Sequence, residues 1–159
     1  MLTPGNSTCL FCKVAAGEVR ARLVFEDQIS LAFLDHRPIF AGHCLLIPKE
    51  HHETLADLPG NLIEPFFKNA QLLARAIEPA IKADGTFVAI NNRVSQSVPH
   101  LHVHVVPRRR KDGLKGFFWP RHPYQTEEEA ALVQETIQQA VAELTKGILS
   151  TTCPFRHQP

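Results

Sequence analysis

The chain has 159 residues, of which 44% are hydrophobic, and this length and composition fit one globular domain with a core of its own. The formal net charge is only +1, which argues against a general nucleic-acid or membrane-surface binder, because such proteins carry a clear excess of Lys and Arg. No run approaches the roughly 20 consecutive apolar residues that cross a bilayer, and the N-terminus lacks the pattern of a secretion signal. We therefore expect a soluble, cytoplasmic protein with a single domain over residues 1–159, its core at about 9–147 and a loose tail at about 148–159.

Short β-like runs fill the first third of the chain. Val, Leu, Ile and Phe recur over Arg22–Glu26, Ile29–Leu34 and His43–Pro48, with turn residues between these runs. We expect three strands, and the brief connection through Asp27 and Gln28 predicts that the first two form an antiparallel hairpin. Cys44, inside the third run, is expected to be a buried small residue.

The hydrophobic period then changes from that of a strand to that of a helix. Apolar residues recur at intervals of three and four from Leu62 to Ile81, which predicts an amphipathic helix that ends near Gly85. Pro65 is compatible with the first turn of this helix, whereas Pro79 is expected to strain the helix or end it.

Two further strands and a second helix complete the predicted elements. The strands are expected at Thr86–Asn91 and Leu101–Val106. The helix is expected to start at Thr126, which forms a Thr-x-x-Glu capping box with Glu129, and to end at Gly147. Five strands, largely in hairpin order, and two main helices predict an α+β fold with a mostly antiparallel sheet, one face of which the first helix covers.

The residues best suited to catalysis or metal binding lie between His100 and His104. Side chains alternate between the faces of a strand, so His100, His102 and His104 share one face while Leu101 and Val103 point to the other. Neighbouring histidines then lie roughly 6.5–7 Å apart along the backbone, from a rise of ~3.3 Å per residue. One interpretation is a solvated polar face. The other is a reactive row, because histidine serves as nucleophile, acid, base or metal ligand near neutral pH.

The stretch from His100 to Val106 resembles the His-φ-His-φ-His-φ-φ signature of the histidine triad (HIT) family, where φ is an apolar residue. The segments that precede it fit the same family: Ala32-Phe33-Leu34-Asp35, Gly42-His43, Ile47-Pro48-Lys49 and Gln96-Ser97-Val98. The resemblance extends roughly from Cys9 to Pro107 and implies a HIT-like fold and a homodimer. Members of this family hydrolyse or transfer nucleoside monophosphates that are linked to a leaving group, through a covalent nucleotidyl-histidine.

The resemblance implies catalytic roles for three histidines. The middle residue of the row, His102, is the expected nucleophile, and a neutral imidazole suits attack on a phosphorus atom. His104 is expected to contact the phosphate or the leaving group, and His43 resembles the additional histidine that orients the row.

Four other residues match substrate contacts of the family. Gln96 and Ser97 match its phosphate-contacting pair, and Asp35 matches the acidic residue on the ribose hydroxyls, whose protons a carboxylate can accept. Asn91 matches a polar contact at the end of a strand. From the residues alone, the less favoured alternatives are a turn residue before Pro38 for Asp35 and a loop cap for Asn91.

The loop before Gln96 departs from the family pattern. Many relatives have a longer, glycine-rich loop here, whereas the segment from Asn91 to Ser95 contains no glycine. The backbone is then expected to approach a phosphate less closely. Arg93 either supplies positive charge in place of that approach or is simply solvated.

Cys9 and Cys12 form a Cys-x-x-Cys pair, which by itself fits either a redox pair or metal ligands, although no thioredoxin-like βαβ pattern surrounds it. Zinc-binding relatives, and the related galactose-1-phosphate uridylyltransferases, place ligands at the positions of Cys9, Cys12, His51 and His100. The resemblance therefore implies a Cys₂His₂ zinc site, with His52 as the less favoured neighbour. Four protein ligands close the coordination sphere, so this zinc is expected to be structural.

The leading hypothesis is an enzyme that acts on AMP-X, where X is an amine, phosphate, sulfate or acyl group. Hydrolysis of dinucleoside polyphosphates or of adenylylsulfate is an alternative, and the run from Asp112 to Arg121 resembles a subgroup that includes plant adenylylsulfatase-type proteins. Repair of adenylated nucleic-acid ends gains support from the basic run Arg108–Lys111, but the C-terminal zinc finger of aprataxin-like relatives is missing. A nucleotide-binding scaffold with incidental catalysis is the alternative from another class. The expected partner is a small nucleotide, not a nucleic acid or a membrane.

Overall fold

The computed structural model describes residues 8–114, 124–129, 131–136 and 138. The chain divides into two compact units, Met1–Leu114 and Lys115–Pro159, which are described separately below. Every site residue that the sequence predicts lies in the first unit. Among the described residues, no helix combines the length and the apolar character that a membrane span requires.

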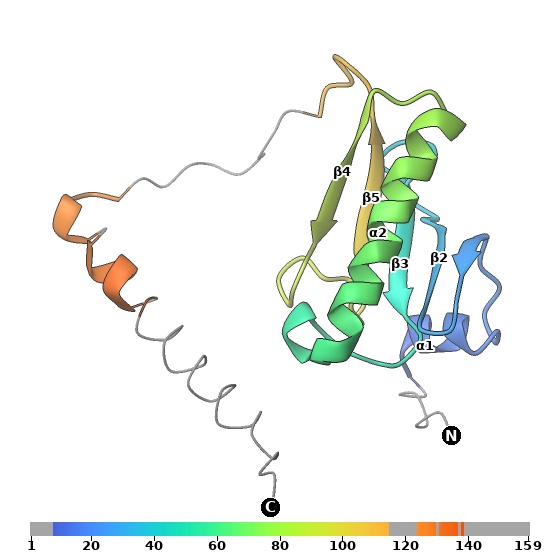
Figure 1. The fold of residues 1–159 in the computed structure, drawn as a ribbon, viewed down its shortest axis with the longest axis horizontal. Helices are drawn as coiled ribbons and strands as arrows, with labels where there is room; N and C mark the ends of the chain where they lie inside the picture. Colours follow the sequence, from blue (N-terminus) through green and yellow to red (C-terminus); the bar gives the residue numbers. More distant parts are fainter. Residues whose placement is uncertain (1–7, 115–123, 130, 137, 139–159) are drawn as a thin grey trace, which may run out of the picture. The chain divides into compact units, whose positions relative to one another are not determined.

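The first unit is built on a five-stranded sheet in which all neighbouring strands are antiparallel. Its strands are β1 (Leu23–Glu26), β2 (Ser30–Leu34), β3 (Cys44–Pro48), β4 (Gly85–Ile90) and β5 (Val103–Arg108). The spatial order is β1-β2-β3-β5-β4, so the last strand in sequence lies between β3 and β4 (Figure 1). This crossover places the histidine-bearing strand inside the sheet, where both of its edges are hydrogen-bonded.

Helix α2 (Gly60–Ala80) covers one face of the sheet, as the sequence predicts (Figure 1). Its apolar side buries Phe66, Leu73 and Ile77 against residues of β3 and β5 in one hydrophobic cluster. The helix starts two residues before Leu62, so Pro65 falls in the second turn, and it ends one residue after Pro79.

The opposite face of the sheet is packed by a short helix that the sequence analysis missed. Helix α1 spans Leu10–Ala15 and buries Phe11 and Val14 in a second cluster of apolar side chains. Six residues are too few for a hydrophobic period to be recognised. Apolar side chains therefore pack against both faces of the sheet, α1 covers only part of its face, and the histidines lie on the side of α1.

The second unit contains the start of the other predicted helix. Residues 127–129, 131–136 and 138 are helical. The Thr126 hydroxyl accepts a hydrogen bond from the Glu129 amide at 3.1 Å, whereas the Glu129 carboxylate accepts from Gln125 rather than from Thr126. The expected end at Gly147 and the tail lie outside the described residues, and the single domain over residues 1–159 stays a prediction.

Candidate active site and metal centre

The histidine row begins just before β5. His100, Leu101 and His102 precede the first residue of the strand, and the Leu101 amide is held by the His52 carbonyl at 2.6 Å. Leu101 and Val103 are fully buried in the cluster beneath α2, which turns the histidines to the other face. The predicted alternation of side chains therefore places the row correctly, although the regular ladder starts later than expected.

His102 has its two ring nitrogens in different environments. Its Nδ1 lies 2.7 Å from the carbonyl oxygen of His100, and because a carbonyl only accepts, Nδ1 must carry the proton. The neutral ring then keeps an unprotonated Nε2. The side chain is 3% exposed yet lines a pocket, so the free nitrogen belongs to a ring that packing holds in place.

His43 and His104 form a second oriented pair at the other end of the row. The Ile39 amide donates to Nδ1 of His43 at 3.2 Å, so the proton of a neutral His43 is on Nε2. That Nε2 lies 3.0 Å from Nδ1 of His104, which accepts the hydrogen bond and leaves the His104 proton on its own Nε2. A chain of hydrogen bonds that starts at a backbone amide thus determines the tautomers of both rings.

Burial keeps this pair of histidines neutral. It lowers the pKa of His43, against the opposing effect of Asp35. The pKa of His104 falls to about 4, mainly through burial and then through the neighbouring His102 and His43. Asp35 has an oxygen 3.5 Å from Nδ1 of His43, but that nitrogen carries no proton in the neutral ring, so this contact is not a salt bridge at neutral pH.

His102 and His104 line a pocket of about 620 Å³. Its walls are mainly apolar, with Phe11, Val14 and Leu45 among them, and Phe11 stacks edge-on against His102 with ring centres 5.3 Å apart. The sequence does not predict a pocket role for the other lining residues, which are Leu10, Phe11, Val14, Val19, Arg20, Ala21, Arg22, Phe33, Leu34, His36 and Leu45. Most of them come from α1, the segment after it and β2, and their assembly depends on tertiary packing.

The predicted substrate contacts fall into two groups. Asp35 and Ser97 line the pocket. Gln96 instead accepts from the Arg93 amide and donates to the Glu53 carbonyl, both at 2.6 Å, and Asn91 donates to the Ser95 carbonyl at 3.4 Å. Gln96 and Asn91 thus hydrogen-bond within and beneath their loop, and their contacts to substrate stay predictions.

The loop that lacks glycine nevertheless contains two left-handed residues. Arg93 has φ = 67° and Ser95 has φ = 58°, a region that residues with a Cβ atom adopt only at a cost. The hydrogen bonds of Gln96 hold this shape, together with the Asn92 side chain, which accepts from the Leu55 amide at 2.9 Å. Side-chain hydrogen bonds therefore support a backbone conformation that glycine would adopt more easily.

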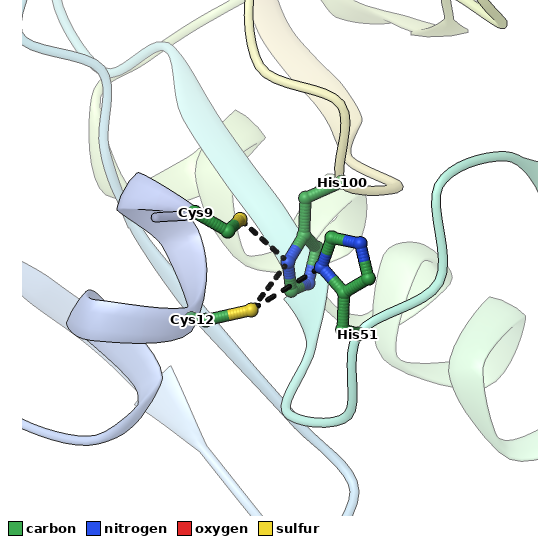
Figure 2. Close-up of side chains that lie close together, drawn as sticks. All are labelled: Cys9, Cys12, His51 and His100. Atoms are coloured by element: carbon green, nitrogen blue, oxygen red, sulfur yellow. Dashed lines mark hydrogen bonds between the residues drawn. The ribbon is translucent and has the colours of Figure 1, made fainter. Parts of the chain in front are cut away.

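Cys9, Cys12, His51 and His100 converge behind the row, and their ligand atoms all lie within 4.8 Å of one another (Figure 2). The cysteines come from the start of α1, His51 follows β3, and His100 precedes β5. Sγ of Cys12 lies 3.2 Å from Nδ1 of His51 and 3.5 Å from Nδ1 of His100, and Sγ of Cys9 lies 3.5 Å from the latter. Sulfur and nitrogen ligands of tetrahedral zinc are separated by roughly 3.5 Å, so these distances fit the ion.

The hydrogen bonds of His100 also fit a metal ligand. Its Nε2 donates to the Pro48 carbonyl at 2.9 Å, so the unprotonated nitrogen is Nδ1, which faces both sulfur atoms. The side chain is completely buried, and burial lowers its pKa to about 4, which keeps it available as a neutral ligand. Cys44 is buried in the cluster beneath α2 instead, as expected, and belongs to neither site.

Comparison with known proteins identifies the family. A family model described as "HIT domain" matches residues 16–111. Adenylylsulfatase HINT3 of Arabidopsis thaliana is 30% identical over 146 residues, which cover 87% of this chain and 72% of the relative. Adenosine 5'-monophosphoramidase hnt1 of Schizosaccharomyces pombe is 33% identical over 129 residues, covering 80% of this chain and 95% of the relative. The chain therefore belongs to the histidine triad family.

Solved structures confirm the predicted fold. SMU.412c from Streptococcus mutans UA159 matches with a TM-score of 0.77 and 35% identity, over 89% of this chain and 90% of that one. A Zn-bound histidine triad family protein from Mycobacterium smegmatis matches with a TM-score of 0.66 and 36% identity, over 87% and 99% of the two chains. The five-stranded antiparallel sheet with few helices is thus shared with proteins of this family.

Proposed function

We propose that this protein is a nucleotide hydrolase or nucleotidyl transferase that cleaves AMP-X through a covalent intermediate on His102. The observation that carries the proposal is the fixed tautomer of His102. The His100 carbonyl holds its Nδ1 proton at 2.7 Å, and a ring with a free Nε2 lines the pocket beside Asp35 and Ser97. A nucleophile needs a free nitrogen and a fixed orientation, and this hydrogen bond orients the ring and leaves Nε2 as the free nitrogen whenever the ring is neutral.

The pocket suits a nucleoside monophosphate. Its apolar walls, which include Phe11 and Leu45, can bury a base, and Asp35 offers a carboxylate to the ribose hydroxyls. Ser97, which also lines the pocket, has a hydroxyl that can donate a hydrogen bond to the phosphate. The names of the two relatives, an adenylylsulfatase and an adenosine 5'-monophosphoramidase, support an adenylyl group as the recognised half.

The proposed reaction has two steps. His102 Nε2 forms a bond to the α-phosphorus, the bond from phosphorus to X breaks, and X departs with the electron pair. The Nε2–H of His104 is available to stabilise the negative charge that develops on the phosphate or on X. Water, or another acceptor in a transferase, then attacks the same phosphorus and releases His102. Because the nucleotide half is held and X is not, one site can serve several leaving groups.

Zinc at Cys9, Cys12, His51 and His100 is proposed as a structural ion. The donor set and the separations of its atoms support this assignment, as does the similarity to the Zn-bound M. smegmatis protein. With four protein ligands the ion would supply cross-linking and no reactive water. A homodimer is also proposed from the family resemblance, and light scattering of the purified protein tests it.

Trapping the intermediate tests the reaction. We expect rapid quenching at low temperature to capture AMP on His102 from both an AMP amidate and an AMP sulfate, seen by peptide mass spectrometry as the same added mass. His102→Ala should give no adduct. An adduct on another residue, or adducts that differ with the leaving group, would contradict covalent nucleotidyl transfer.

Adenylylsulfate is the second candidate as the preferred substrate, because the relative named adenylylsulfatase aligns over 87% of this chain. Comparing kcat/KM for AMP sulfate, an AMP amidate and a dinucleoside polyphosphate separates the candidates. A protein that binds AMP tightly but turns over none of the three would be a nucleotide-binding scaffold.

A further inference from the structure

Helix α1 connects the metal centre to the pocket. Cys9 is the residue directly before its first turn, Cys12 lies three residues later, and Leu10, Phe11 and Val14 of the same helix line the pocket. Sγ of Cys12 contacts Nδ1 of both His51 and His100, and Sγ of Cys9 contacts Nδ1 of His100. The short helix and the residue before it therefore supply two of the four proposed metal ligands and part of the pocket wall.

This helix is too short to be stable by itself, so its position depends on the packing of Phe11 and Val14 and on the contacts of its cysteines. Helices shorter than about 12–15 residues are marginal in water, and no side chain caps the N-terminus of α1. The chain that follows it, up to Arg22, also lines the pocket, so seven of the sixteen lining residues belong to the segment 10–22. The wall is thus formed by a stretch whose placement depends on what anchors its ends.

Phe11 lies between the two sites. It is 6% exposed, and its ring packs edge-on against His100, a metal-centre residue, at 5.9 Å and against His102 at 5.3 Å. A third edge-on contact, at 5.5 Å, is made with Phe33 of β2. Any displacement of α1 therefore moves an aromatic wall that touches the proposed nucleophile.

The histidine row itself is anchored elsewhere. His100 is bonded through Nε2 to Pro48 of β3, His102 through Nδ1 to the His100 carbonyl, and His104 to His43. The partners of these hydrogen bonds belong to β3, to the residue just before β3 or to the row itself, and none of them belongs to α1. Loss of α1 would leave them in place, so its effect should fall on the pocket rather than on the nucleophile.

We propose that metal bound at Cys9, Cys12, His51 and His100 holds α1 as a wall of the nucleotide pocket, with Phe11 as the positioning residue, so that metal occupancy sets the affinity for nucleotide. The inference rests on the proposed function only in taking this pocket as the nucleotide site. The metal thereby controls substrate binding through packing, without contacting the substrate.

The first test compares the affinity for AMP, which is bound without turnover. Calorimetry is performed on the zinc-containing protein, on protein stripped with a chelator and desalted, and on stripped protein to which Zn²⁺ has been returned. We expect Kd to rise about tenfold on stripping, because an aromatic wall is lost, and to recover with Zn²⁺. Hydrogen exchange at the α1 amides should speed up in parallel, while exchange in β5 changes little.

The second test separates the wall from the metal. Phe11→Ala should retain zinc by elemental analysis yet weaken AMP binding and raise KM more than it lowers kcat, and Phe11→Leu should restore most of the affinity. Cys44→Ala is the matched cysteine control, since Cys44 is buried on the other face of the sheet, and it should keep both zinc and affinity.

Three outcomes are decisive. Weaker AMP binding with loosened α1 in the stripped protein supports the coupling. Equal AMP affinity with and without zinc overturns the coupling and leaves the proposed function intact. Failure of the zinc-containing protein to bind AMP at all contradicts the proposed function, and the coupling to nucleotide affinity falls with it.

Discussion

The two ends of the histidine row are held by different means. At the His100 end, side chains from two other parts of the chain converge on this buried imidazole, and the donor atoms suit a metal ion. At the His104 end, a single ring-to-ring hydrogen bond from His43 sets the tautomer, and the side chain borders a pocket. Chemically identical side chains, four residues apart, thus lie in surroundings that suit different roles.

Under the proposed function, this difference lets one strand contribute to both stability and catalysis. The His100 end, which we call the closed end, links the strand to α1 and β3. The His104 end, which we call the open end, leaves an imidazole proton available to a ligand. His102 lies between the two ends. The His100 carbonyl at the closed end orients its ring, and the pocket at the open end gives a ligand access to it. Changes at the two ends should therefore have separable effects.

The largest effect is expected from removal of the nucleophile. His102→Ala should lower turnover of an AMP amidate by on the order of 10⁴-fold or more, because no neighbouring group can form the covalent intermediate. Binding of AMP should change little, since Asp35, Ser97 and the apolar walls remain. Steady-state kinetics and calorimetry measure the two quantities. Turnover within tenfold of the wild type would reject the mechanism.

Loss of the closed end should chiefly affect stability. The double change Cys9→Ser and Cys12→Ser should abolish the binding of about one zinc per chain and lower Tm by on the order of 10 °C, because a structural metal contributes to folding. Elemental analysis and calorimetric melting check both expectations, with Cys44→Ala as the control that keeps its zinc. An unchanged Tm in the double variant would show that the cluster does not stabilise the fold.

At the open end, the orientation of His104 can be tested by changing its partner. His43→Asn removes the donor to His104 Nδ1 and should lower kcat about tenfold, as the loss of orienting hydrogen bonds does elsewhere. His43→Gln can place an amide N–H near the position of the lost Nε2 and should recover part of the rate. Identical kcat values for the two variants would mean that this hydrogen bond has no role in turnover.

The open end should also give stability a pH dependence. The pKa of His104 is about 4 in the folded chain, against an ordinary value of 6.5, with His102, His43 and Asp35 as the titratable groups that face it. Between these values the unfolded chain binds the proton and the folded chain does not, so stability falls as the pH is lowered from 6.5 towards 4 and is flat above that window.

Because the metal ligands also take up protons in acid, the diagnostic is a difference between two proteins. Urea unfolding at several pH values between 7.5 and 4.5 should show a shallower decline for His104→Gln than for the wild type. His43, whose pKa burial also lowers, should keep part of the slope in that variant. Equal slopes would place the acid sensitivity elsewhere.

The smallest effect is expected in the loop from Asn91 to Ser95. Arg93→Gly should stabilise the fold by about 0.5–1 kcal/mol, because glycine adopts φ = 67° without strain, although it also gains freedom in the unfolded chain. Val94→Gly, at an exposed neighbour whose φ is not positive, should destabilise instead and serves as the control. Denaturant unfolding measures both, and a loss of stability in Arg93→Gly would contradict the strain.

Much of the fold was predictable because each of its main elements carries its own local pattern. The five strands and the helix from Gly60 to Ala80 were identified to within a few residues, since their apolar periods of two and of three to four extend over enough residues. Helix α1 was missed because six residues carry too short a period. The orientation of the Gln96 side chain was not predicted, because it depends on a hydrogen bond to the Glu53 carbonyl, which lies far away in the sequence.

The sequence by itself determined which residues can take part in catalysis or metal binding. The spacing of His100, His102 and His104 put three imidazoles on one face, and the family signature assigned them expected roles. Only the tertiary structure decided what each imidazole does. Which ring nitrogen keeps its proton depends on the Pro48 carbonyl, the His100 carbonyl and the Ile39 amide. Those partners are set by strand pairing and loop packing, because a hydrogen bond depends on distance in space and not on distance along the chain.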